Sequence, residues 1–115
     1  MLIKIYKLLL YVNYVLGMSV ICFYLIAAAL ISYRVLFESN HIGHNLKLYL
    51  PYIFLLCIVG FINLIFTDST SRKIGVFVLT LSLIAFSSVF LLDKFNILVE
   101  YNEWIQRGMP AKPWE

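Results

Sequence analysis

The sequence predicts an all-α integral membrane protein, in which three transmembrane helices are followed by a C-terminal amphipathic helix. Of its 115 residues, 63% are hydrophobic and only 13% are charged, whereas about a quarter of the residues in a soluble domain are charged. The excess apolar surface therefore favours a lipid environment. Two further observations support this fold class: the apolar residues form three long uncharged stretches, and the charged residues lie at the ends of those stretches.

The three uncharged stretches are residues 8–33, 48–67 and 74–92. A helix needs about 20 apolar residues to cross the hydrocarbon core of a bilayer. Helices are favoured there because lipid offers backbone groups no hydrogen-bond partners. The charged residues that flank the stretches are Lys4, Lys7, Arg34, Lys47, Asp68, Arg72, Lys73, Asp93 and Lys94. We therefore assign residues 1–92 to a three-span bundle.

Both connections between the predicted spans are short. Residues 38–45 include Gly43 and two asparagines, which favour turns. Residues 68–73 predict a tight helical hairpin. Asp68, Ser69 and Ser71 are each candidate N-caps for the third helix, because their side-chain oxygens can accept bonds from its first amides.

The tail predicts a different kind of element. Over residues 93–106, apolar side chains recur at helical spacing, which is typical of an amphipathic helix. Gly108 and Pro110 form a stop signal, and the residues after them favour an extended chain. We therefore assign residues 93–115 to an amphipathic helix and an extended tail. Such a helix either lies on the membrane surface or docks against a partner.

Small and polar residues in the spans predict where the helices meet. In antiparallel neighbours with about 1.5 Å of rise per residue, Gly17 and Gly60 fall at the same depth, and Asn13 and Asn63 fall together one turn nearer the same face. Membrane helices associate through small residues and interhelical hydrogen bonds. The predicted helix–helix interface comprises Asn13, Gly17, Gly60, Asn63, Gly75 and Thr80. A polar ligand or ion site, or a contact with another subunit, remains an alternative use of the same residues.

Two other groups of residues are candidates for docking a partner. One is a stripe of small side chains on the third span. Its serines either bond to backbone carbonyls of their own helix or the stripe receives a foreign helix. The other is the apolar face of the tail. The candidates are Ser82, Ala85, Ser88, Ile97, Tyr101, Trp104, Ile105 and Trp114.

The residues with reactive side chains form no complete site. His41 and His44 are close enough to share a metal, but a site needs further ligands, and Glu38 is the only carboxylate nearby. A solvated pair and a pH sensor are the alternatives. Cys22 and Cys57 lie in apolar runs without a CxxC spacing, which indicates small buried hydrophobes. We expect no metal and no cofactor.

Several classes of function are disfavoured. The sequence has no HExxH, GxSxG or P-loop motif, so we expect no enzyme. The spans contain no ionisable acid or base to mark a transport pathway, and the chain has no basic cluster suited to nucleic acid. The expected partners are the lipid bilayer and a larger membrane protein complex.

We therefore expect a non-catalytic accessory or structural subunit, or a regulator, of a larger membrane protein complex in a bacterial or mitochondrial inner membrane. It would bind through its helix faces and its C-terminal tail. An immunity-type protein against a membrane-active toxin and a small homo-oligomeric pore are alternatives. For the pore alternative, the chain is similar to a phage holin in size and span count only. Basic residues are more frequent before the first span than directly after it, which favours an N-terminus on the inside.

Overall fold

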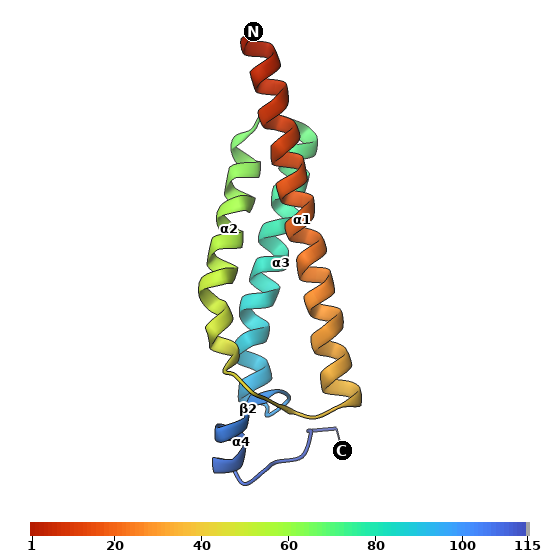
Figure 1. Ribbon diagram of the computed structural model, residues 1–115, viewed down its shortest axis with the longest axis vertical. Coiled ribbons are helices and arrows are strands. Elements are labelled where there is room, and N and C mark those ends of the chain that lie inside the picture. The colour runs from red at the N-terminus through yellow and green to blue at the C-terminus, as the bar shows by residue number, and fades with distance from the viewer. Residues whose placement is uncertain (115) are drawn as a thin grey trace.

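The computed structural model describes residues 1–114, and the chain is 77% helical. Three long helices, α1 (Leu2–Phe37), α2 (Leu50–Ile65) and α3 (Ser69–Lys94), form an elongated bundle of 64 × 22 × 18 Å, in which α3 lies between the other two (Figure 1). Three helical segments, Leu2–Phe37, Leu46–Ile65 and Ser69–Lys94, are long and apolar enough to cross a membrane. The predicted number of such helices is therefore confirmed.

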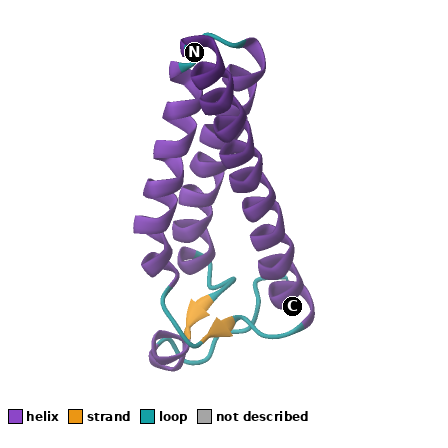
Figure 2. Ribbon diagram, turned by 45° about the horizontal axis from the view of Figure 1, so that its top comes forward, coloured by secondary structure: helices purple, strands orange, loops and turns teal. Residues whose placement is uncertain are grey.

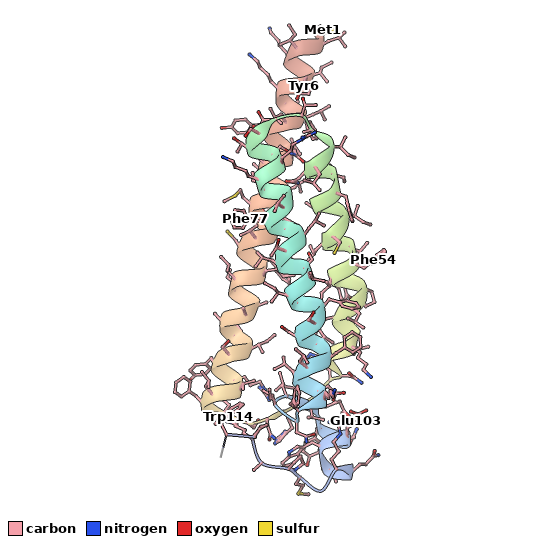
Figure 3. All side chains as sticks on the ribbon, turned by 180° about the vertical axis from the view of Figure 1, so that it is seen from behind. Met1, Tyr6, Phe54, Phe77, Glu103 and Trp114 are labelled. Carbon is pink, nitrogen blue, oxygen red and sulfur yellow. The ribbon has the colours of Figure 1, made fainter. Side chains whose placement is uncertain are left out.

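The helices α1 and α3 are longer than the uncharged stretches. Helix α1 has 36 residues and includes Lys4, Lys7 and Arg34, because lysine and arginine are good helix formers. Charge marks the limit of an apolar stretch without ending the helix. The start of α1 projects beyond the α2–α3 hairpin: Tyr6 contacts Phe66 at the hairpin, with ring centroids 6.0 Å apart, and Met1 lies farther out (Figure 3).

The starts of α2 and α3 follow from local side-chain chemistry. A 3-10 turn, η1 (Leu46–Tyr49), leads into α2, and the Asn45 side chain caps it by accepting from the Lys47 amide at 2.9 Å. Of the three candidate caps for α3, Asp68 takes the role, because its carboxylate accepts from the Ser71 amide at 3.1 Å.

The tail differs from the predicted amphipathic helix. The strand β1 (His41–Ile42) pairs in parallel with β2 (Val99–Glu100), and between residues 95 and 114 only the six residues of α4 (Tyr101–Gln106) are helical (Figure 2). The chain leaves α3 through Asn96, which has a φ of 58°. Leu98 and Val99, each 1% exposed, then turn inward. Burial of two large apolar side chains, about 1.5–3 kcal/mol each, outweighs continuation of the helix.

The loop after α1 and the tail together form one folded unit, which we call the end cap (residues 38–45 and 95–114). Asn40 holds it together: its side-chain amide donates to the carbonyls of Asn96 and Pro110, at 3.1 and 2.8 Å, and its own carbonyl accepts from the Val99 amide at 2.9 Å. Lys112 adds a bond to the Glu38 carbonyl at 3.2 Å. The residues after α4 are therefore tied to the loop that follows α1.

Two apolar clusters fill the inside of the molecule. The larger lies next to the end cap and includes Val35, Ile42, Leu46, Ile53, Val89 and Leu98. The smaller lies nearer the hairpin and consists of Val20, Tyr24, Ile74 and Val78. Many large apolar side chains instead point outward, as Phe54 and Phe77 do (Figure 3).

Candidate functional site

A buried hydrogen-bond chain joins the three helices near the hairpin. The side-chain amide of Asn13 in α1 donates to the Ser71 hydroxyl of α3 at 2.5 Å. That hydroxyl donates in turn to the backbone carbonyl of Asn63 in α2 at 2.6 Å. Asn13 is 3% exposed, and Asn63 and Ser71 are completely buried. We call these three residues the polar joint. The two asparagines are thus bridged by Ser71, whose role in packing was missed because its position suggested only a cap.

Glycines let the helices approach at the polar joint, although in a different pairing from the predicted one. A Cβ on Gly17 would collide with the Asn63 side chain and Ile74, whereas a Cβ on Gly75 would lie 2.9 Å from the Gly60 carbonyl oxygen. Gly17 therefore packs against Asn63 and α3, and Gly60 packs against α3. The nearest neighbours of the two glycines are therefore different residues: Asn63 of α2 and Ile74 of α3 for Gly17, and Leu79 and Val78 of α3 for Gly60.

Thr80 lies outside this interface. Its side chain is exposed on α3, whereas Ile74, Val78 and Ser82 of the same helix are buried. The prediction used the position of Thr80 along the axis of its helix and did not consider the direction in which its side chain points around that axis. With about 3.6 residues per turn, a residue two positions from a buried one faces largely the other way.

The two asparagines of the polar joint each keep one amide oxygen without a hydrogen-bond partner among residues 1–114. The oxygen of Asn63 lies against Gly17, where Cα–H groups are weak donors at close helix contacts. Its amide nitrogen donates to the Val59 carbonyl at 2.9 Å. These contacts indicate a packing role for Asn63.

The small-residue stripe of α3 is used largely inside the bundle. Ser82 is 1% exposed and shares a 2.7 Å hydrogen bond with the Tyr24 hydroxyl of α1. Ala85 packs against both apolar clusters. Ser88 donates to the Ile84 carbonyl of its own helix at 2.8 Å. The stripe therefore bonds to α1 and to the backbone of α3 and packs inside the bundle, so little of it is open to a foreign helix.

The docking candidates of the tail lie in the end cap. Ile97 packs against the larger apolar cluster, and Trp104 is half-buried, with its indole donating to the Pro110 carbonyl at 3.0 Å. Three others are exposed: Tyr101 by 45%, Ile105 by 38% and Trp114 by 50%. Trp114 lies at the end of α1 that adjoins the end cap (Figure 3).

The two histidines have separate partners. The His41 ring packs against Tyr101 and Trp104, with centroids 5.2 and 4.2 Å away. The His44 ring bonds to the Tyr49 hydroxyl. Across residues 1–114, no three His, Cys, Asp or Glu side chains are grouped as metal ligands.

A shallow and widely open groove lies along the outer face of α1. Its volume is about 730 Å³, and we call it the α1 groove. The residues that line it are Tyr11, Tyr14, Val15, Met18, Ser19, Cys22, Phe23 and Ile26. Ser19 and Cys22 are small and exposed, so the prediction that Cys22 is buried was wrong. Two small residues three positions apart among large ones were the signal that could have identified it.

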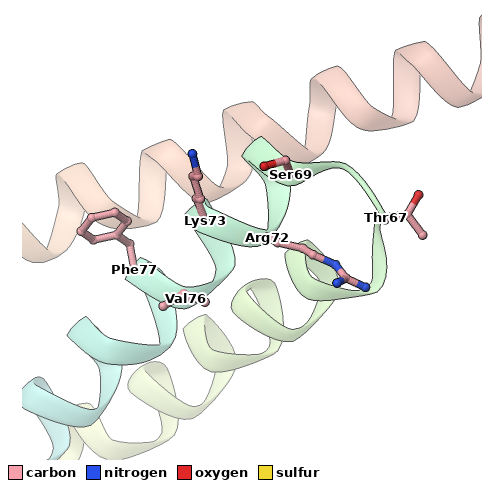
Figure 4. A pocket seen from close by; sticks show the side chains of 6 residues that line it. All are labelled: Thr67, Ser69, Arg72, Lys73, Val76 and Phe77. Carbon is pink, nitrogen blue, oxygen red and sulfur yellow. The ribbon is translucent and has the colours of Figure 1, made fainter.

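A second hollow, of about 490 Å³, lies at the hairpin, and we call it the hairpin hollow (Figure 4). The residues that line it are Thr67, Ser69, Arg72, Lys73, Val76 and Phe77. It combines hydroxyl groups and two cations with an apolar side. Beside it, Asp68 accepts a hydrogen bond from the Tyr14 hydroxyl. This bond, followed by the bond from the Ser71 amide, lowers the pKa of Asp68 below its ordinary value.

No protein-family model matches the chain, and neither characterised proteins nor solved structures show a significant similarity to it.

Proposed function

We propose that this chain is a non-catalytic membrane protein that acts as an accessory subunit or regulator of a larger membrane protein complex. The α1 groove is the observation that carries the proposal, since it is a shallow, mainly apolar hollow with small side chains at its centre that the rest of the chain does not cover. A partner helix is its proposed occupant.

The outward-facing surface supports insertion of all three helices in a bilayer. In the most apolar window of each helix, at most 28% of the residues are buried within the chain. Phe54 and Phe77 are 72% and 62% exposed. Because each square ångström of apolar surface left in water costs about 25 cal/mol, lipid is the favourable surrounding.

The shape of the α1 groove supports helix docking. Cys22 lies two positions from the buried Val20, which is about 200° around the helix, so it faces away from the bundle. Small residues at such a surface let a second helix backbone come close, which is how membrane helices associate without a hydrophobic driving force. Tyr11 and Phe23, which are 71% and 58% exposed, line the same groove with large side chains.

The polar groups of the spans support a non-catalytic role. Asn13, Asn63 and Ser71 bond to one another or to the backbone, and Tyr24 bonds to Ser82. These contacts stabilise helix packing. The carboxylates lie in connections, helix ends and the end cap, away from the middle of the spans, where a general base would have to act.

The end cap supports a fixed position at a membrane surface. Tyr101 and Trp114 are exposed there, and Tyr and Trp are enriched where membranes meet water. In this proposal the end cap anchors one end of the bundle, and its exposed aromatic residues provide a second contact for the complex.

Purification in mild detergent, followed by quantitative mass spectrometry, tests the proposal. We expect the tagged chain to co-purify with larger membrane proteins in fixed stoichiometry. Ser19→Phe and Cys22→Phe should lower that yield, whereas Ala28→Phe, which changes an exposed small residue of α1 outside the groove, should leave it unchanged. Elution as a monomer would contradict the proposal, and so would elution as a homo-oligomer that leaks ions from liposomes.

A further inference from the structure

The charges at the two ends of the bundle are arranged differently. Four cationic side chains lie at the hairpin end: Lys4, Lys7, Arg72 and Lys73. The carboxylate at this end is Asp68, which bonds to the Tyr14 hydroxyl and the Ser71 amide. These cations are therefore left facing outward with an excess of positive charge.

The opposite end neutralises much of its charge internally. Arg34 pairs with Glu38 at 3.3 Å, and Arg107 pairs with Asp93 at 3.2 Å and with Glu103 at 3.3 Å. All salt bridges found within residues 1–114 are at this end. The hairpin end thus offers positive charge to an external anion, whereas the end-cap side does not to the same degree.

The hairpin hollow gives that positive charge a shape. The Nε atom of Arg72 donates to the Phe66 carbonyl at 3.4 Å, which folds the side chain over the connection between α2 and α3. Arg72 and Thr67 lie on one side of the hollow, and Lys73 and Phe77 lie on the other (Figure 4). Val76 and Phe77 are 56% and 62% exposed, and they continue toward the apolar middle of α3.

We propose that the hairpin hollow binds the headgroup of an anionic phospholipid. Arg72 and Lys73 contact the phosphate, since guanidinium groups form paired hydrogen bonds to phosphate oxygens and ammonium groups act as point charges. Val76 and Phe77 contact the start of an acyl chain. The apolar side distinguishes a lipid from a soluble phosphate, which would gain nothing from these two residues. This inference requires membrane insertion and is independent of partner docking.

Titration of the full-length chain in neutral detergent with phosphatidylglycerol or phosphatidylcholine, followed by native mass spectrometry, tests this site. We expect tighter binding of phosphatidylglycerol. The Arg72→Gln/Lys73→Gln variant should lower its affinity at least about tenfold, because each basic residue near a membrane surface contributes substantially to the attraction of anionic lipid. The matched variant Lys47→Gln/Lys94→Gln removes two exposed cations of the other end and should retain the preference.

Three results would overturn the site. They are equal binding of the two lipids by the wild type, an equal loss of preference in both double variants, and complete competition by inorganic phosphate. The single variant Lys73→Gln is the control for misfolding, because Lys73 is exposed and makes no salt bridge within residues 1–114. It should keep wild-type helicity and show a smaller loss of phosphatidylglycerol binding, and unchanged binding would count against the proposal.

Discussion

The Asn13 amide donates to the Ser71 hydroxyl at 2.5 Å and so joins α1 to the start of α3 across 58 positions of sequence. Ser71 in turn donates to the Asn63 carbonyl of α2. A single hydroxyl group therefore connects the three long helices at the hairpin end.

Ser71→Ala removes both of these bonds and leaves the buried side-chain amide of Asn13 without its hydrogen-bond acceptor. We expect a loss of about 1–2 kcal/mol in the free energy of unfolding, because interhelical bonds contribute modestly and unpaired buried groups add a penalty. Detergent-induced unfolding followed by circular dichroism measures it. Ser88→Ala is the matched control, since Ser88 bonds only within its own helix. Equal stability of the two variants would contradict the joint.

Gly17→Ala should destabilise the bundle by about 1–3 kcal/mol, the range typical of overpacking. The added methyl group would collide with Asn63 and Ile74. The control is Gly43→Ala, because nothing lies within 4 Å of a Cβ at Gly43. Thermal unfolding in detergent compares the two variants, and a Gly17→Ala protein as stable as Gly43→Ala would show that α1 packs elsewhere.

Tyr24 and Ser82 should be energetically coupled. In a double-mutant cycle with Tyr24→Phe and Ser82→Ala, we expect a coupling of about 0.6 kcal/mol and at most about 1.7 kcal/mol, as measured for bonds between membrane helices. The 2.7 Å distance between the two hydroxyl oxygens is the basis. Strictly additive effects would mean that this bond does not form.

Acid should weaken the hairpin through Asp68. Its pKa is lowered in the folded chain, chiefly by the bond from Tyr14 and then by the Ser71 amide. The stabilisation is therefore fully present above the ordinary value of 3.8 and is lost as the pH falls through the lowered folded pKa. Stability measured against pH should decline less steeply below 3.8 in Asp68→Asn than in the wild type. Parallel declines would rule out this contribution.

Asn40→Ala should loosen the end cap without unfolding the helices. The substitution removes side-chain bonds to Asn96 and Pro110, so trypsin should cleave the Arg107–Gly108 bond severalfold faster than in the wild type. Asn102→Ala, a change at an exposed position, is the control. Cleavage at the same rate in both variants would indicate that the tail is already free.

The sequence was sufficient for the helices and insufficient for their mutual packing. Long uncharged stretches predict helices because lipid leaves the backbone no alternative, and three such helices are present. Depth along a helix can be counted from residue numbers, which brought Asn13 and Asn63 to the same level. Rotation and helix order depend on side chains meeting in space, so Thr80 was misplaced and the bridging role of Ser71 was missed.

The end cap shows a different limit of sequence reasoning. The periodicity from Asp93 to Gln106 favours a helix, yet Leu98 and Val99 are buried and β2 pairs with β1. That pairing joins residues more than fifty positions apart, and its stability comes from burial next to the α2 and α3 ends. Local pattern contains no information about such a contact. The exposed Cys22 was misjudged for a similar reason, because an apolar residue in a membrane protein can face outward.

Photocrosslinking in the native membrane tests the central claim most directly. A photoreactive amino acid in place of Met18, in the α1 groove, should yield one discrete product that contains a different and larger membrane protein. The same substitution at Ala28 should yield little of that product. Crosslinks only to lipid, or only to a second copy of this chain, would contradict the proposed role as a subunit or regulator of a larger complex.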